Sequence, residues 1–348
     1  MGGAQQAKAG HSVRRARTTQ EETIVKLFKR VELATVLCLI VTGAAHAAAV
    51  APSADAERHA IWRTAIASTP VPGSGCFTAH FPSRTWTPVA CAAAPNRLFM
   101  PASGPRGFTV GNGHDYAAEV SGSIIRTGVG SFPSIKGLTS ETNDGASNQY
   151  SLQMNSQFFA SPACSGGEEN CFGWQQFIYA QPACNPDNPC VFMQSWLINY
   201  GSSCPSGWNY AGDDQCYRNS NATEVPTQSL SDLADLQLSG SAVSGGNDTT
   251  TLTTSTDAYS ASESDTVVGL SGFWDETEFN IVGDGGGSEA DFNTGTKIKV
   301  KIELQDGSTA AATCASNAGT TGETNNLNLG ACKGKGGKKP SISFTESN

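Results

Sequence analysis

The chain has 348 residues, of which 38% are hydrophobic and only 15% charged, with 38 Gly and 16 Pro. Without residues 1–47, which hold seven basic and three acidic side chains, 15 basic and 28 acidic side chains remain, a net charge of −13. This charge argues against partners such as nucleic acid or an anionic membrane surface. Because the abundant Gly, Ser, Thr and Asn favour turns over helices, the composition predicts an all-β protein with one core.

The N-terminal segment has the parts of a secretory signal. Lys26, Lys29 and Arg30 form a basic flank, an apolar run follows over residues 33–45, and Ala45-His46-Ala47 is a small-residue cleavage site. The run is too short for a stable membrane anchor. We interpret 1–47 as a signal peptide with a long leader. The sequence therefore predicts a secreted protein, extracellular or periplasmic, that is not inserted in a membrane and is a monomer.

The cysteines predict disulfides. Cys38 lies in the signal, and the other ten are an even number in an oxidising compartment. We expect sequence neighbours to pair: Cys76–Cys91, Cys164–Cys171, Cys184–Cys190, Cys204–Cys216 and Cys314–Cys332. No Cys-x-x-Cys occurs and only three His remain after signal removal, so we expect no metal and no other cofactor.

The rest of the chain divides into three parts. Residues 48–75 are rich in Ala, Ser and Pro, with a short helical patch around 56–67, and we interpret them as a spacer or short propeptide. Residues 76–115 form a cysteine-closed arm that we expect to pack on the main domain. Residues 116–348 are then the β-sandwich domain.

Short segments with apolar residues at every second position predict strands separated by turns. The clearest is 273–284, in which Phe279 and Ile281 fall on one face and Glu278 and Asn280 on the other. Further segments are 118–125, 150–158, 174–179, 191–200, 236–242, 249–254, 266–270, 297–304 and 341–345, while 128–133 leads into a turn. So many short strands imply two packed antiparallel sheets.

Amides and acids recur on the polar faces of these strands. A solvated outer face would explain any one strand, but the repetition suggests that the polar faces line one groove. A carboxylate beside a neutral amide can take a proton from water while the amide N–H stabilises an oxyanion. The candidate substrate-binding residues are Gln153, Asn155, Trp174, Gln175, Gln194, Trp196 and Glu276, with either Gln175 or Gln176 facing the groove. His114 and Asp115 follow a Gly-Asn-Gly turn, and we assign them a turn-stabilising role.

The order of the segments from about residue 120 to about residue 302 resembles the glutamic peptidases of the eqolisin family. Trp174–Phe177 stands where the family has the strand of its catalytic glutamine. Glu276–Ile281 stands where it has the strand of its catalytic glutamate, while Ser151 and Asn155 replace a family tryptophan and aspartate. The resemblance implies a concanavalin A-like jelly-roll of a divergent bacterial secreted branch, with Gln176 and Glu278 as the catalytic pair.

The resemblance implies a secreted acid endopeptidase that acts on extracellular polypeptide. One alternative is a glycan-binding or polysaccharide-active jelly-roll protein, in which Trp174, Trp196 and Trp274 stack on sugar rings. A second alternative is a disulfide-stapled envelope protein without catalysis. A carboxylate paired with an amide in a concave face would favour the peptidase, whereas a flat aromatic platform would favour glycans.

The signal-peptide interpretation predicts that the mature protein begins soon after Ala47, because signal peptidase cuts after the second small residue of an A-x-A site. N-terminal sequencing of the protein exported from cells tests this expectation. A mature chain that retains Lys26 to Arg30 would contradict it.

Overall fold

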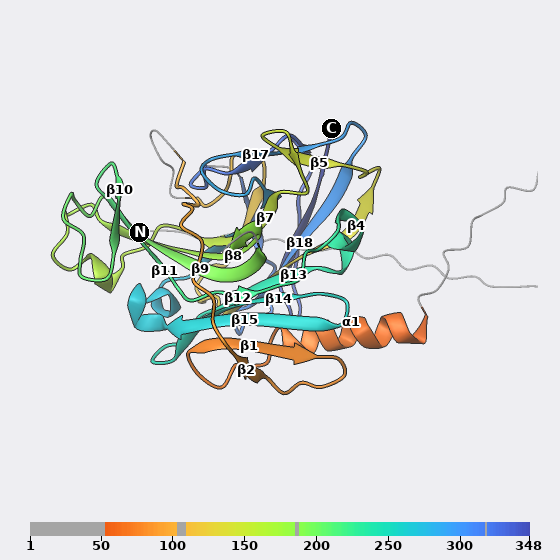
Figure 1. Cartoon of the computed structure of the whole chain (residues 1–348), viewed down its shortest axis with the longest axis horizontal. Helices are drawn as coiled ribbons and strands as arrows, with labels where there is room; N and C mark the ends of the chain where they lie inside the picture. The colour runs from red at the N-terminus through yellow and green to blue at the C-terminus, as the bar shows by residue number, and fades with distance from the viewer. Residues whose placement is uncertain (1–52, 103–108, 185–187, 317–318) are drawn as a thin grey trace, which may run out of the picture. The chain divides into compact units, whose positions relative to one another are not determined.

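Two large antiparallel sheets pack face to face in the computed structural model, which describes residues 53–102, 109–184, 188–316 and 319–348 (Figure 1). The expected all-β sandwich is therefore confirmed. The predicted signal peptide lies outside the described residues. Among the helices that are described, none has the length and apolar character needed to cross a membrane.

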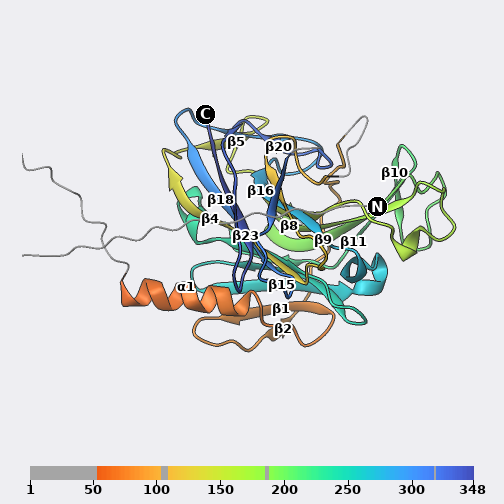
Figure 2. The ribbon, with the colours of Figure 1, turned by 180° about the vertical axis from the view of Figure 1, so that it is seen from behind.

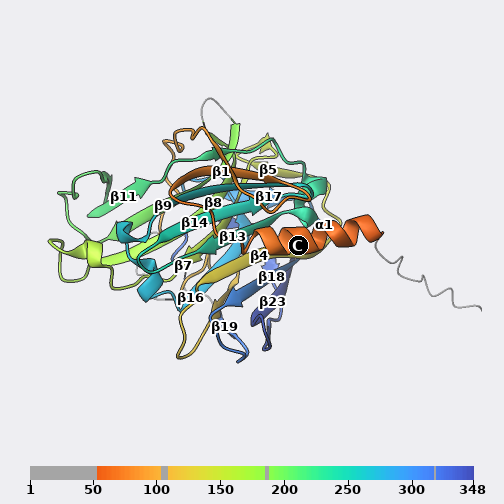
Figure 3. The same ribbon diagram turned by 90° about the horizontal axis from the view of Figure 1, so that it is seen from below.

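The first sheet has ten strands in the order β2-β1-β15-β14-β13-β4-β18-β23-β21, with β22 also paired to β23. Figure 3 shows its middle strands side by side. The strands are β1 (Gly75–His80), β2 (Thr87–Val89), β4 (Thr127–Lys136), β13 (Gln237–Ser241), β14 (Asn247–Thr253), β15 (Asp257–Ser264), β18 (Lys297–Gln305), β21 (Asn328–Leu329), β22 (Lys333–Lys335) and β23 (Ser341–Ser347).

The second sheet has nine strands in the order β10-β11-β9-β8-β7-β16-β3-β19, with β12 also paired to β9. The strands are β3 (Tyr116–Glu119), β7 (Tyr150–Ser156), β8 (Phe172–Cys184), β9 (Asn188–Ile198), β10 (Asn209–Gly212), β11 (Gln215–Asn219), β12 (Thr223–Glu224), β16 (Glu276–Val282) and β19 (Thr313–Ser316). A small sheet joins β5 (Glu141–Asn143), β6 (Ala146–Ser147), β17 (Glu289–Phe292) and β20 (Thr324–Asn325).

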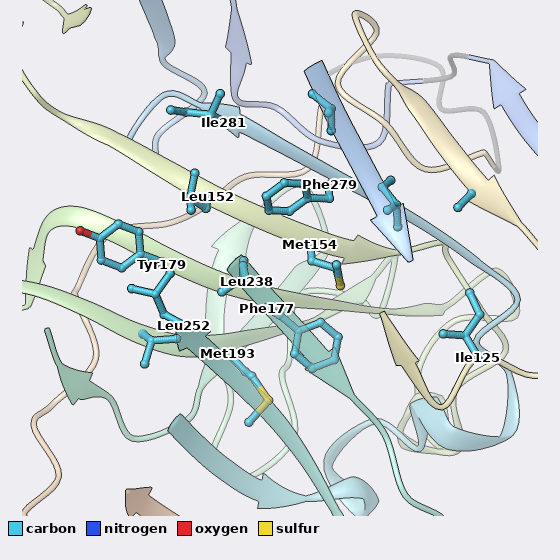
Figure 4. Packing of buried hydrophobic residues seen from close by; sticks show 14 of the residues in the cluster. Ile125, Leu152, Met154, Phe177, Tyr179, Met193, Leu238, Leu252, Phe279 and Ile281 are labelled. Carbon is cyan, nitrogen blue, oxygen red and sulfur yellow. The ribbon is translucent and has the colours of Figure 1, made fainter. Parts of the chain in front are cut away.

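The main core lies between the two large sheets. Phe279 of β16 stands opposite Met154 of β7, which stands opposite Phe177 of β8. These side chains point toward Leu238 and Leu252 of the first sheet (Figure 4). Each such apolar side chain contributes about 1.5–3 kcal/mol when it leaves water. This packing fixes the register of the second sheet, because a slip by one residue would move every side chain to the other face.

Two glycines in the first sheet allow the sheets to approach each other. A Cβ on Gly130 of β4 would lie 2.0 Å from the ring of Phe279, and a Cβ on Gly240 of β13 would lie 2.4 Å from the ring of Phe177. Two large aromatic rings of the second sheet therefore rest directly on the backbone of the first.

Helix α1 (Ala54–Ile66) lies where the sequence predicts a short helical patch within the spacer or short propeptide. It begins after Ser53, whose side chain accepts a hydrogen bond from Ala56 N. Trp62 and Ile66 are buried with Phe77 of β1. Figure 2 shows the helix beside β1. The helix is part of the folded unit, because its apolar side chains at i and i+4 find a partner in the sheet. The first residues of the expected arm, 76–80, lie in strand β1 of the first sheet.

Several strand boundaries also differ from the expectations. Residues 266–270 do not form a strand: they run from the short 3-10 turn η3 (Asp265–Val267) to the 3-10 turn η4 (Leu270–Gly272). The strand of this region is β15, upstream of them, and residues 128–133 lie inside β4. The two other 3-10 turns are η1 (Pro162–Cys164) and η2 (Leu230–Asp235).

The five predicted disulfides are confirmed. They are Cys76–Cys91, Cys164–Cys171, Cys184–Cys190, Cys204–Cys216 and Cys314–Cys332, and their sequence separations run from 6 to 18 residues. Disulfides that close loops of this size typically stabilise a fold by about 2–4 kcal/mol. Such a set is typical of proteins that fold in an oxidising compartment.

The close approach at Gly130 predicts that Gly130→Ala lowers the free energy of unfolding by about 1–3 kcal/mol, since the new methyl group overlaps the Phe279 ring. Denaturant unfolding measures the loss. Gly272→Ala is the matched control, because no atom lies within 4 Å of its Cβ position. Equal stability of the two variants would contradict this account of the packing.

Candidate functional site

Four polar side chains form a row across the middle of the second sheet, on the face turned away from the core. Glu278 of β16 stands opposite Asn155 of β7, Asn155 opposite Gln176 of β8, and Gln176 opposite Gln194 of β9. With neighbouring strands about 4.8 Å apart, the row is about 14 Å long. All four side chains are at most 2% exposed, so the expected open groove is covered in this structure.

Some predicted site residues lie elsewhere. Gln175 faces the core, where its Oε1 accepts from Ser195 Oγ at 2.8 Å, so Gln176 is the glutamine of the row. Trp274 also lies in the core, with its ring 5.4 Å from that of Phe177. Trp174 and Trp196 share the face of the row but are fully buried. Glu276 is half-buried at the edge toward β3, where it stands opposite Glu119.

Glu278 accepts two hydrogen bonds on one oxygen. Asn155 Nδ2 donates to Glu278 Oε1 at 2.6 Å, and Thr321 Oγ1 donates to the same oxygen. Asn155 Nδ2 also lies 3.0 Å from Thr321 Oγ1. The hydroxyl of Thr321 therefore sits above Asn155 and against the glutamate. These hydrogen bonds favour the charged form of Glu278, while burial disfavours it and is the larger effect, so the pKa of Glu278 is raised.

A second carboxyl group, Asp115, meets Glu278. Asp115 is fully buried, and its Oδ1 accepts from Asn112 N at 3.1 Å. The oxygens Asp115 Oδ2 and Glu278 Oε2 receive no hydrogen bond from an N–H or hydroxyl of the described chain, and the two carboxyl groups lie close enough for each to shift the pKa of the other. Burial, and then the charge of Glu278, raise the pKa of Asp115 well above its usual range. Of the two groups, Asp115 is therefore the one whose neutral form is favoured more strongly.

Sequence reasoning assigned Asp115 only to a turn. The turn is present, since Asn112 N donates to Asp115 Oδ1, but the carboxyl group also reaches β16 from the adjacent strand β3. An acidic residue directly before the short apolar strand Tyr116–Glu119 was the available signal. Thr321 gave no signal, because it comes from a segment without alternation.

Gln176 is joined to Glu278 through other side chains. Its Nε2 donates to Gln153 Oε1 at 3.3 Å, and Asn155 Nδ2 donates to the same oxygen at 3.2 Å. Its Oε1 accepts from Trp196 Nε1 at 2.9 Å. One N–H of the Gln176 amide thus has an acceptor and the other has none within the described residues. Glu278 and Gln176 flank Asn155, about 10 Å apart along the row by strand spacing.

Two segments cover the row. The strap, residues 97–102, crosses the Gln194 end: Phe99 N donates to Gln194 Oε1 at 2.8 Å, and Gln194 Nε2 donates to Arg97 O at 3.2 Å. The cover segment, residues 319–323, lies over the Glu278 end through Thr321 and Glu323. Strap and cover segment bond to each other, with Gly322 N donating to Met100 O at 2.8 Å.

Two further buried acids surround this layer. Glu323 accepts from Met100 N at 3.0 Å and from Gln153 Nε2 at 3.3 Å, and burial raises its pKa to about 7. Glu346 accepts from Asn280 Nδ2 at 2.8 Å, and burial raises its pKa to about 8. Neither has a salt-bridge partner in the described chain, so both favour the neutral form.

No group of three or more His, Cys, Asp or Glu side chains in the described ranges could hold a metal ion. A scan against protein-family models finds no match to this chain, and a search of curated proteins finds no relative. The chemistry of the site therefore follows from its own residues: a carboxylic acid and a carboxylate in contact, with a line of neutral amides beside them.

The buried acids predict that the fold is more stable in acid. The pKa values of Glu323 and Glu346 in the folded state, about 7 and about 8, lie above the ordinary glutamate value of 4.5. The folded state then holds protons that the unfolded state has released. The contribution of Glu323 and Glu346 to the free energy of unfolding is full below about pH 4.5. It falls as the pH rises toward 8, by up to about 1.4 kcal/mol per pH unit for each group.

Thermal unfolding from about pH 4 to about pH 8.5 measures this dependence. Glu346→Gln is the diagnostic variant, because it keeps the shape of the side chain and removes one titrating group, so the fall of Tm with pH should be shallower. A parent protein whose Tm rises between these pH values would contradict the assignment of raised pKa values.

Proposed function

We propose that this protein is a secreted acid endopeptidase of the glutamic type, in which Glu278 activates the attacking water. The observation that carries the proposal is the contact of Glu278 with Asp115, at the head of a row of neutral amides. Two carboxyl groups that share one proton in a buried site provide one acid and one base at the same pH. The resemblance of the segment order to the eqolisin family supports the same reaction.

The groups around Glu278 and Asp115 indicate which of the two acids is the base and which carries the proton. Asn155 and Thr321 donate to Glu278, which favours its charge, whereas the charge of Glu278 raises the pKa of Asp115. Glu278 is therefore the base and Asp115 the proton carrier. Glu278 acts as a base at a pH at which it is charged while Asp115, whose pKa is raised well above its usual range, stays protonated.

The hydroxyl of Thr321 indicates where the water would bind. It contacts both Asn155 and Glu278, so a water in its place after movement of the cover segment would keep both hydrogen bonds. Glu278 takes a proton from this water as its oxygen attacks the peptide carbonyl carbon. The free N–H of Gln176 stabilises the oxyanion, and the proton passes to the leaving amine as the C–N bond breaks.

A polypeptide fits this face better than a glycan does. The strap is a polypeptide segment whose backbone is held on the row by hydrogen bonds to Gln194. A glycan site would need exposed aromatic rings on which sugars could stack. Trp274 lies in the core, and the rings of Trp174 and Trp196 are tilted by 43° to each other, so they form no flat platform.

The mechanism predicts that Glu278→Gln abolishes hydrolysis of a denatured protein substrate at acidic pH, since the side chain keeps its shape but loses its basicity. Gln176→Ala should lower kcat by roughly 10²–10³ if its amide is the main oxyanion donor. Peptide release between about pH 3 and pH 7 is measured, and circular dichroism confirms that each variant folds.

Gln175→Ala is the matched control. It removes the adjacent glutamine of the same strand, whose side chain faces the core, so kcat should stay within a few-fold of the parent value. A Glu278→Gln variant as active as the parent, or equal losses at Gln175 and Gln176, would refute the proposed roles.

A further inference from the structure

The strap is bound along both of its edges by hydrogen bonds of the kind that hold a peptide substrate. On one side Phe99 N and Arg97 O bond to the amide of Gln194. On the other side Gly286 N donates to Leu98 O at 2.7 Å and Gly322 N donates to Met100 O at 2.8 Å. Alternate backbone groups thus bond to opposite sides, as in the addition of a strand to a sheet edge.

The side chain of Phe99 fills an apolar pocket beside the row. It is fully buried, with its ring 5.7 Å from that of Phe192, and it packs with Ile178 and with the Cys184–Cys190 disulfide. Ile178 is two residues from Gln176 along β8, and Phe192 is two residues from Gln194 along β9. Because side chains alternate along a strand, pocket and row share one face of the sheet.

We propose that the strap occupies the substrate site of its own chain, and that the Phe99 pocket selects substrates with an aromatic or large aliphatic side chain. This inference rests on the proposed function, because the occupied site is a substrate site only if the protein is a peptidase. Phe99 packs in a cluster of apolar residues, so the pocket suits an apolar side chain of a polypeptide. The described conformation is then a latent one, closed by an internal segment.

The direction of the strap places the pocket relative to the reacting bond. From Phe99 at Gln194 the chain continues to Met100, which bonds to Glu323, and to Ala102, whose N–H donates to Thr320 O at 2.8 Å. It therefore runs toward the Glu278 end of the row. Gln194 and Asn155 are two strand spacings apart, about 10 Å, which an extended chain spans in about three residues. We expect cleavage about three residues after the side chain in the pocket.

The test measures binding without relying on hydrolysis. A labelled synthetic hexapeptide with the sequence of residues 96–101, Asn-Arg-Leu-Phe-Met-Pro, is titrated into the full chain carrying Phe99→Ala, and fluorescence anisotropy follows binding at acidic pH. The emptied pocket should bind this peptide about tenfold to hundredfold more tightly than a peptide with Ala in place of Phe. The parent chain should bind it more weakly, because its strap competes at a millimolar effective concentration.

Phe77→Ala is the matched control, since it removes a buried phenylalanine from the α1 cluster and leaves the strap in place. It should bind the peptide no better than the parent does. Equal binding of the two peptides by folded Phe99→Ala chain, or no binding of either, would overturn the inference. Tight binding together with inactivity of parent and Phe99→Ala chain would keep the peptide site and refute the peptidase.

If Phe99→Ala does not fold, the proposal is tested on the parent chain by hydrogen exchange. Added hexapeptide at about 1 mM should raise the hydrogen-exchange rates of the Phe99 and Met100 amides, which lose their acceptors on Gln194 and Glu323 when the strap is displaced. The Ala-containing peptide should leave both rates unchanged. Rates that neither peptide alters, or that both raise equally, would refute the proposal.

Discussion

Glu278 is buried with no ion-pair partner among the described residues, and the polar half of this structure depends on this constraint. An ionised carboxylate inside a protein is costly unless hydrogen bonds or a shared proton offset the loss of water. Here Asn155 and Thr321 supply the hydrogen bonds, and Asp115 is the neighbouring acid whose neutral form is favoured more strongly. These partners come from β7, from the cover segment and from the turn before β3, so three separate parts of the chain must meet above β16.

The second sheet is therefore covered on both faces, by two different kinds of interaction. Toward the first sheet, Phe279 and Phe177 pack on glycines, and close contact leaves no room for water. On the other face, amides and acids bond to one another and to the strap. An apolar interior tolerates small shifts, but a hydrogen-bond network loses strength when one member moves. This polar layer thus specifies a single arrangement of the covering segments.

Much of the fold could be predicted from the local sequence pattern, while the positions of the strap and the cover segment could not. Alternation in Glu276–Val282 separates Phe279 from Glu278, and the spacing of the cysteines predicts their pairs. The strand β15 escaped prediction because its inward positions are Ala and Ser rather than large apolar residues. Thr321 and the strap contact the row although they are distant from its strands in the sequence. A local pattern of residues cannot predict such a contact. Trp274 lies before the start of β16, so the alternation of side chains along that strand does not predict which face it takes.

The short disulfide loops have a consequence for how the chain matures. Thiolates form disulfides, and thiolates are scarce in acid, so oxidation proceeds best near neutral pH. At that pH the buried carboxyl groups disfavour the folded state. Each disulfide joins cysteines at most 18 residues apart, and can therefore close before the sheets assemble. Covalent bonds made early would hold the chain together at neutral pH, where the buried carboxyl groups weaken the fold.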